Sequence, residues 1–314
     1  MRTIETIETD LMNTLERQGR PVRRRLQLFQ VLAAVALTTL FPPMRVTAAD
    51  LKPETLQAWE AYLQTAKARN HKHLADGASF LSIGAEPADS AKLRQGEVIV
   101  SPARPNVPVK VPSGLIHDWA GVIFIPNASI GDVMHVVRDY DHYQEFYQPN
   151  VVGSKPIEMG EREDRFSVVI MNKSFFAKSA LDSDYRSTFV RVDDEHWYST
   201  SETTRVQEMA DYGAASQHLL PEDHGRGIIW RLYSFARYEE RDGGVYIELE
   251  AIALSRDIPA TLRWVAEPIV RRVSRSALAT SLQQTADAVR ASATTTRDHG
   301  TGAAVKAGVT SSFR

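Results

Sequence analysis

One hairpin constrains the fold of this chain more than any other stretch of its sequence. Two strand-like runs, 228–240 and 245–254, flank the turn residues Asp242-Gly243. An Asp-Gly pair supplies the positive φ angles that a tight hairpin turn needs, so the register of the two strands follows by counting back from it. The expected partners are Arg241 with Gly244, Arg237 with Glu248, and Leu232 with Ala253.

This register sorts the hairpin side chains onto two faces, because successive residues of a strand point to opposite sides. The mostly apolar face carries Trp230, Leu232, Ser234, Ala236, Ile247, Leu249, Ala251 and Ala253. The polar face carries Arg231, Tyr233, Arg237, Tyr246, Glu248 and Glu250. We interpret the charges as cross-strand ion pairs, each worth under about 1 kcal/mol if exposed.

The elements around the hairpin predict an α+β domain. A strand over 115–125 ends at Pro126, and Asn127 or Ser129 can cap a short helix that follows it. Several strand-like runs occupy 151–210. A long helix over about 260–291 ends the domain, and Pro268 within it predicts a kink or two segments.

The first residues have the pattern of an export signal. Arg23 to Arg25 precede an apolar run, 26–41, which is short for a membrane span, and small residues follow at 47–49. We expect residues 1–49 to be a secretory signal peptide, cleaved near Ala48-Ala49, which would place the protein in the periplasm or outside the cell. The alternative is an uncleaved anchor in the inner membrane. Translation from Met12 instead of Met1 would give a signal peptide of the usual length.

The remaining chain divides into three parts. Residues 50–112 form an N-terminal extension, with a helix over 53–69 and irregular or short strands after it. Residues 113–292 hold the main domain. Residues 293–314 are rich in Thr, Ala and Gly, a composition that predicts a disordered tail.

Several stretches resemble a bacterial exported branch of the START-like (SRPBCC) superfamily. They are Gly114-Leu-Ile-His-Asp-Trp-Ala-Gly, Tyr147-Gln-Pro-Asn-Val-Val, Ser199-Thr-Ser-Glu-Thr-Thr-Arg, Ile229-Trp-Arg-Leu-Tyr-Ser-Phe-Ala-Arg, and Ser255-Arg-Asp-Ile-Pro. The resemblance implies a helix-grip fold, in which a curved antiparallel sheet wraps a long C-terminal helix around a cavity. Members of the wider superfamily bind lipids, sterols, quinones or polyketides, and some are cyclases; the resemblance implies no catalytic residue here.

We expect small residues on the apolar face to leave room for a hydrophobic ligand, since burial of each ligand CH₂ is worth about 0.8 kcal/mol. The expected lining consists of Trp230, Leu232, Ser234, Ala236, Leu249, Ala251, Ala253, Leu262, Val265 and Ile269. Four aromatic residues could form the mouth of the cavity or a hydrophobic plug: Tyr140, Tyr143, Phe146 and Tyr147.

Nothing in the sequence predicts a cofactor, a metal or a catalytic residue. The chain has no cysteine, which excludes disulfides, thiolate nucleophiles and Cys-based metal sites. Its nine histidines lack metal-site spacing, and only His218 and His224, with Glu222 and Asp223, form a cluster. The formal charge of −2 gives no global field that favours nucleic acid. Transient membrane contact is compatible with a carrier of a lipid-like ligand.

Two rival functions stay open at this point. If the faces of the hairpin are inverted, Tyr233, Glu248 or Glu250 could act in a cyclase or hydrolase that uses the same cavity. If side chains fill the interior, the domain would be a non-catalytic interaction module. The sequence does not determine the ligand or the oligomeric state.

Overall fold

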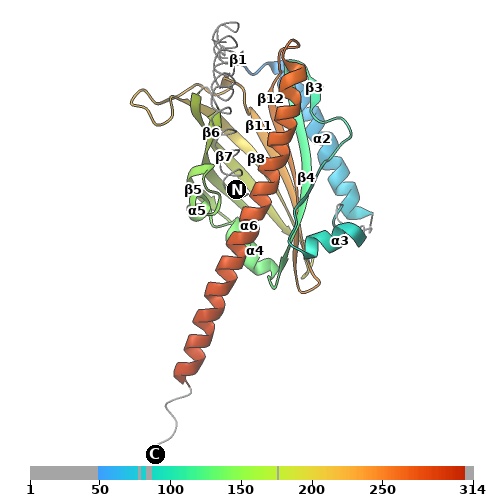
Figure 1. Ribbon diagram of the computed structural model, residues 1–314, viewed down its shortest axis with the longest axis vertical. Helices are drawn as coiled ribbons and strands as arrows, with labels where there is room; N and C mark the ends of the chain where they lie inside the picture. Colours follow the sequence, from blue (N-terminus) through green and yellow to red (C-terminus); the bar gives the residue numbers. More distant parts are fainter. Residues whose placement is uncertain (1–48, 77–78, 83–86, 175–176, 308–314) are drawn as a thin grey trace, which may run out of the picture. The chain divides into compact units, whose positions relative to one another are not determined.

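The computed structural model describes residues 49–76, 79–82, 87–174 and 177–307 of the 314-residue chain (Figure 1). The predicted signal peptide, 1–49, therefore lies outside the described residues apart from Ala49. The described part is an α+β unit built on one large antiparallel sheet, with helices on both of its faces.

Ten strands form the large sheet, and its main path runs in the order β2-β4-β12-β11-β8-β7-β6-β5. Every pairing in it is antiparallel, with β3 added beside β4 and β9 beside β8. The strands are β2 (Ile99–Pro102), β3 (Val109–Val111), β4 (Gly114–Pro126), β5 (Val151–Met159), β6 (Glu163–Ser174), β7 (Ala177–Arg191), β8 (His196–Ala210), β9 (His218–Leu219), β11 (Arg231–Arg241) and β12 (Gly244–Arg256). Separately, β1 (Ala49–Asp50) pairs with β10 (His224–Gly225).

The predicted hairpin register is confirmed. Arg241 pairs with Gly244, Arg237 with Glu248 and Leu232 with Ala253. Asp242 and Gly243 have φ angles of 57° and 75°, as a turn with positive φ at both central residues requires. On its other side β12 pairs with β4 along its whole length, so β12 is a central strand.

A short helical region connects β4 to β5. Pro126 ends β4, and Ser129 caps α4 (Ile130–Val137) by accepting a hydrogen bond from the Asp132 amide at 3.2 Å. The Asp132 carboxylate in turn accepts from the Ser129 amide, which completes a capping box. The 3-10 helix η1 (Tyr140–His142) and α5 (Tyr143–Phe146) follow.

Two helices define the two faces of the sheet. Helix α6 (Arg263–Ala307) packs Leu278, Leu282, Ala286 and Val289 on one face, here called the α6 face. Helix α2 (Pro53–Ala75) packs Trp59, Leu63 and Ala66 on the opposite face, the α2 face. Helix α3 (Pro87–Arg94) also lies on the α2 face, where Leu93 shares a cluster with Val122 and Tyr246. Figure 1 shows α6 running along one side of the sheet, with α2 and α3 beyond β4.

Two helices are longer than the sequence predicts. α2 continues to Ala75, and α6 runs unbroken through Pro268 to Ala307, into the segment for which composition predicts disorder. Pro268 is the sixth residue of α6, so the backbone hydrogen bond that it cannot donate is lost near the start of the helix, and the helix continues beyond it.

Candidate functional site

The central strand β12 is covered unequally on its two faces. On the α2 face, Tyr246, Glu248, Glu250, Ile252 and Leu254 are all buried. On the α6 face, Val245 and Ile247 are buried near the hairpin turn, but the next residues on that face are partly exposed: Leu249, Ala251 and Ala253. A central strand beneath a helix stays accessible only where the helix stands off from it. We call this part of the α6 face the open region.

The open region extends over the neighbouring strands as rows of small side chains. Strand register places Ala251 beside Ser234, Ser234 beside Ser201, and Ser201 beside Ser187. Ser234 and Ser201 are partly exposed, and the Ser187 hydroxyl donates to Ser201 at 2.8 Å. This row crosses four strands without one large side chain.

The position of α6 explains why one end of the α6 face is filled and the other is open. A Cβ built on Gly121 would lie 2.8 Å from a Leu282 methyl group, so helix and sheet are in close contact there. Helix α6 packs mainly along β4, with further contacts to β2, β12, α4 and α5. Among the described residues, its contact with β7, β8 and β11 is slight at most.

The structure brings together five of the ten residues expected to line a cavity. Leu232, Ser234, Leu249, Ala251 and Ala253 are partly exposed residues whose strand register places them on the α6 face. Their role in ligand binding stays a prediction. The sequence analysis did not identify Ser187, Ser201 and Thr203 as neighbours of these residues on adjacent strands. The sequence shows how side chains alternate along each strand, but not which strands lie side by side.

The other five expected residues lie elsewhere. Ala236 is buried in the core beneath α6, and Leu262 is partly exposed just before that helix. Val265 and Ile269 are exposed, because the side of α6 that carries them does not pack on the sheet. Trp230 was placed on the wrong face: it precedes β11 and packs in the α2-face cluster.

Two buried ring nitrogens border the open region on β4. His117 pairs with Ala253 and Trp119 with Ala251, and both side chains are more than nine-tenths buried. His117 Nε2 lies 2.9 Å from the Ser255 hydroxyl. His117 Nδ1 and Trp119 Nε1 have no hydrogen-bond partner among the described residues. Burial lowers the pKa of His117 to about 4, so its imidazole is neutral at neutral pH.

The four aromatic residues of the expected mouth form a packed layer. Tyr140 stacks on Phe166 with ring centroids 4.0 Å apart, and its hydroxyl donates to Asp164 at 3.0 Å. Tyr143 donates to the Val137 carbonyl at 2.6 Å, and the Tyr147 hydroxyl lies 3.0 Å from that of Thr285 on α6. Phe146 packs against the core under α6. These contacts connect η1 and α5 to β6 and α6; a role at a cavity mouth stays a prediction.

The polar face of the hairpin is the α2 face, so the faces are not inverted. Arg237 pairs with Glu248 as expected, but both are almost wholly buried under the N-terminal extension and not on an exposed face. From the sequence alone, a row of charged side chains suggests a solvent-exposed face, because no residue nearby in the chain shows that another segment covers it. Arg231 instead pairs with Asp223 at 2.6 Å, outside this row.

Side chains of helix α2 form hydrogen bonds and ion pairs with these buried charged residues. Asn70 accepts a hydrogen bond from Arg237 Nη2 at 2.8 Å and donates to Glu250 Oε2 at 2.9 Å. Arg69 also pairs with Glu250, and the Ser82 amide donates to Glu248 at 2.7 Å. The extension therefore provides hydrogen-bond partners that buried charges need.

A second carboxyl shares the site with Glu250. Asp118 is fully buried, accepts a hydrogen bond from the Tyr62 hydroxyl at 2.7 Å, and lies 3.7 Å from Arg69 Nη2. Burial, and then the negative charge of Glu250, raise the pKa of Asp118 to about 7. The Asp118 carboxyl is therefore protonated below about pH 7.

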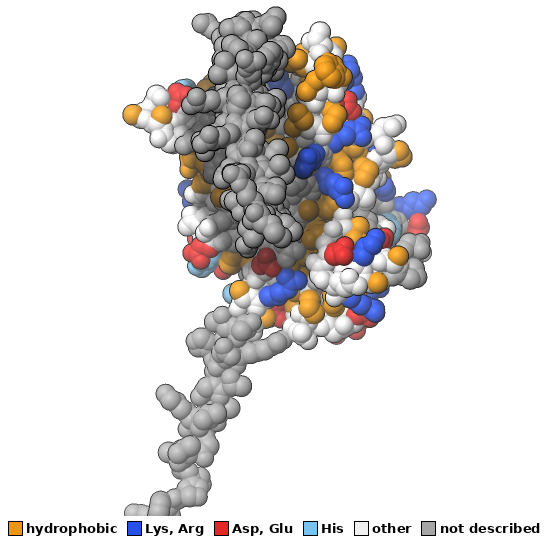
Figure 2. Space-filling view, in the orientation of Figure 1, with side chains coloured by type: hydrophobic (Ala, Val, Ile, Leu, Met, Phe, Trp, Pro, Cys, Tyr) orange, Lys and Arg blue, Asp and Glu red, His pale blue; other side chains and the backbone are white. Residues whose placement is uncertain are grey.

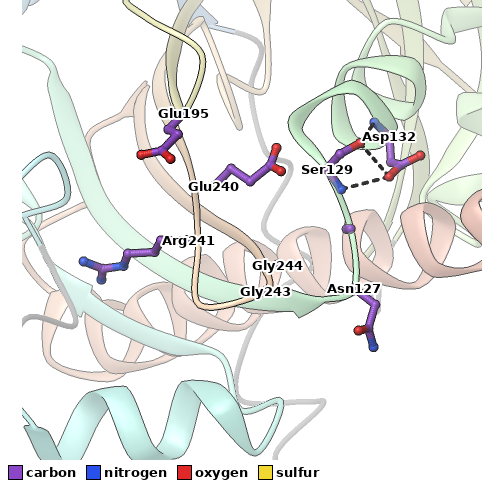
Figure 3. Close-up of a pocket in the computed structure, with 9 residues that line it drawn as sticks. Asn127, Ser129, Asp132, Glu195, Glu240, Arg241, Gly243 and Gly244 are labelled. Atoms are coloured by element: carbon purple, nitrogen blue, oxygen red, sulfur yellow. Dashed lines mark hydrogen bonds between the residues drawn. The ribbon is translucent and has the colours of Figure 1, made fainter.

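Three pockets lie outside the open region. One of about 470 Å³ lies between the hairpin turn and the start of α4 (Figure 3). Two of its three acidic residues serve the fold, since Asp132 caps α4 and Glu240 accepts from the Ile130 amide at 2.8 Å. Two pockets of about 400 and 390 Å³ lie beside α2, and both include Lys67 and Glu202.

The histidine cluster of the 218–224 loop is divided among structural contacts. His224 Nδ1 lies 2.7 Å from an Asp50 carboxylate oxygen, and His218 Nδ1 lies 2.9 Å from the Ser216 carbonyl. Within the described residues, no three His, Asp or Glu side chains are grouped closely enough to hold a metal ion. In the same part of the chain, no helix combines the length and apolarity that spanning a membrane requires.

A large antiparallel sheet with a long C-terminal helix along one face defines an α+β domain of the helix-grip class, as the sequence predicts. No protein-family model and no curated protein matches the sequence. Solved structures with a similar fold include a STAR-related lipid transfer protein from Xanthomonas axonopodis, which is 18% identical, with 61% of this chain and 98% of that chain covered and a TM-score of 0.40.

Two further solved structures are similar at lower identity. Human STARD10 is 9% identical, with 64% of this chain and 79% of that chain covered and a TM-score of 0.37. The aromatase/cyclase Zhui from a Streptomyces species is 10% identical, with 56% and 94% covered and a TM-score of 0.33. Similarity at this level shows nothing of the ligand, and the fold class depends on the chain's own strand order and register.

Proposed function

We propose that this protein binds a hydrophobic small molecule, such as a lipid, sterol, quinone or polyketide-like compound, in the open region beneath the first half of α6. The observation that carries the proposal is the partial exposure of Leu249, Ala251 and Ala253 on a central strand. Large side chains would normally fill such a position, because protein interiors pack densely. Here the neighbouring residues across the sheet are also small, and Ser234 and Ser201 keep some exposure as well.

The chemistry of the open region suits a mainly apolar ligand with few polar groups. Leucine and alanine side chains offer apolar contact, and ten buried CH₂ groups would contribute roughly 8 kcal/mol before ordering costs are subtracted. The partly exposed hydroxyls of Ser234 and Ser201 offer hydrogen bonds to a carbonyl or hydroxyl oxygen on the ligand. The site needs no cofactor for this function.

Substitution of a small residue by a large one tests the proposal. Ser234→Phe fills the open region, and we expect it to weaken binding of the neutral fluorescent probe N-phenyl-1-naphthylamine by at least about tenfold. The matched control is Thr200→Phe, a similar enlargement of a partly exposed residue on the α2 face, which should change probe affinity less than about twofold. Equal affinity of both variants and the unaltered protein would contradict a site in the open region.

Native mass spectrometry of protein purified from its source, with organic extraction, identifies the natural ligand. Recovery of an apolar compound that is absent from Ser234→Phe prepared in the same way would support the proposal. If the unaltered protein carries no such compound and shows no thermal shift with lipids, sterols or quinones, the carrier function is wrong.

We also propose that the protein is exported and that residues 1–49 are removed near Ala48-Ala49. The support is the order of arginines, apolar run and small residues in the first 49 positions. N-terminal sequencing of protein from the periplasmic fraction tests this. A mature chain that retains the apolar run 26–41 and sediments with the inner membrane would favour the uncleaved anchor instead.

A further inference from the structure

Exposed apolar side chains are concentrated at the start of α6. The described residues include eight exposed large hydrophobic side chains, and four of the eight lie in the ten-residue stretch 264–273 of α6. They are Trp264, Val265, Ile269 and Val273, with 80%, 44%, 57% and 60% of their surfaces accessible. Single exposed apolar residues are ordinary on protein surfaces, whereas a contiguous set indicates a surface that contacts something else.

Helical geometry places these residues on one side of α6. At 100° per residue, positions 264, 265, 268, 269 and 273 fall within one half of the helix circumference. The partly buried residues Ala266, Val270 and Ser274 fall in the other half. The first part of α6 thus packs on the protein with one side and presents an apolar side to solvent.

Arginines surround this apolar side. Residues 263–275 contain four arginines and one glutamate, a formal charge of +3 in a chain whose total is −2. Arg271 pairs with Glu267 at 2.9 Å, while Arg272 and Arg275 form no ion pair with any acidic residue in the described parts of the chain. Figure 2 shows hydrophobic and basic side chains together over the upper part of α6.

We propose that this exposed side of residues 263–275, here called the docking surface, binds an anionic lipid bilayer. Tryptophan prefers the level of the lipid headgroups, aliphatic side chains enter the boundary of the acyl region, and arginines bind lipid phosphates. A second copy of the chain is a poorer occupant, since two surfaces of +3 would repel each other.

The biological role of the docking surface depends on the proposed binding of a ligand in the open region. α6 begins at Arg263, shortly after β12 ends at Arg256, so the docking surface lies at the same end of the sheet as Ala253 in the open region. A bilayer bound there lies near the open region, and an apolar ligand would cross little water when it leaves the lipid.

The absence of cysteine from the chain permits a test at single residues. A Val273→Cys variant of the full chain carries one environment-sensitive label on the docking surface, and Val192→Cys is its control, because Val192 is 54% exposed and lies outside α6. Vesicles of phosphatidylcholine, alone or mixed with phosphatidylglycerol, are then added.

We expect emission at position 273 to shift to the blue and rise at least about threefold with the anionic vesicles only. High salt should abolish this response, because it screens the arginines from the lipid phosphates. The label at position 192 should not respond. The label reports its own surroundings, so vesicle binding by another part of the chain without a response at position 273 overturns the proposal. A response that depends on protein concentration without vesicles also overturns it, in favour of a second copy.

Charge reversal gives an independent measurement. The double variant Arg272→Glu/Arg275→Glu should lower the vesicle partition coefficient by about fivefold or more for each arginine, whereas Arg165→Glu on β6 should not change it. Unchanged partitioning of the double variant contradicts the proposal. Binding of N-phenyl-1-naphthylamine without vesicles should be the same in all three proteins, so failure of the docking surface and failure of the ligand site are separable.

Discussion

Replacement of Asp118 by asparagine tests whether the buried carboxyl beneath α2 carries a proton. Asp118 is fully buried, next to Glu250 and the Tyr62 hydroxyl. Burial and the charge of Glu250 raise its pKa to about 7, although Arg69 lies 3.7 Å away and acts in the opposite direction. Asparagine has nearly the same shape as the protonated acid but does not titrate, so it isolates the contribution of the proton.

The raised pKa has a definite consequence for stability. In the unfolded chain the Asp118 pKa is near 3.8, so between pH about 4 and about 7 the folded state holds one proton more than the unfolded state. The stability that this proton contributes is fully present below about pH 4. It falls by about 1.4 kcal/mol per pH unit as pH rises, or roughly 4 kcal/mol by pH 7. The variant escapes this loss.

Urea unfolding, followed by tryptophan fluorescence from pH about 4.5 to about 8, measures the effect. We expect Asp118→Asn to gain stability relative to the unaltered protein as pH rises, with the difference reaching a plateau above about pH 7. Titrations of groups far from Asp118 are common to both proteins and cancel in the difference. A difference that is independent of pH, or that turns against the variant as pH rises, would refute the protonated Asp118 and indicate an ionised Asp118 paired with Arg69.

Three further substitutions have expected outcomes by the same measurement. As pH rises from about 4 to about 6.5, the free energy of unfolding of His117→Gln should fall by about 3 kcal/mol relative to the unaltered protein. The reason is that the lowered pKa of His117 makes the folded state of the unaltered protein more stable as pH rises through this range. Equal pH profiles of the two proteins would show that the imidazole titrates normally. Asn70→Ala should cost about 2–4 kcal/mol, since Arg237 and Glu250 each lose a buried partner, and a cost near zero would show that water replaces the amide. Leu282→Ala should cost about 3–4 kcal/mol through the cavity it leaves, unless α6 is only loosely held on β4.

Local signals in the sequence predicted the hairpin, its register and the cap of α4. Asp242-Gly243 determines the turn, and the alternation of side chains then assigns each residue of both strands to a face. Ser129 was one of two predicted caps of α4, beside Asn127, because a capping hydrogen bond connects residues that are close in the chain; the reciprocal bond to Asp132 was not predicted. Such features depend on neighbours in the chain, which the sequence shows directly.

Features that depend on distant segments could not be predicted in this way. Alternation identified Glu248 and Glu250 as residues of one face, but nothing near them shows that α2, some 180 positions earlier in the chain, covers that face. Helical spacing likewise grouped Val265 and Ile269 without showing which side of α6 packs on the sheet. Trp230 was misplaced because alternation was extended beyond the first residue of β11.

The contrast between the two faces also bears on the enzyme hypothesis. Glu248 and Glu250, two of the candidate acid-base groups, are buried under α2. The third, Tyr233, is also buried, but it lines the pocket of about 390 Å³ beside α2. On the α6 face the buried Asp164 carboxylate accepts hydrogen bonds from Arg138 and Tyr140. In the open region His117 is a neutral imidazole with one nitrogen near Ser255 and the other unpartnered among the described residues. General acid-base chemistry there would require this buried imidazole to become accessible and to act with a second titratable group.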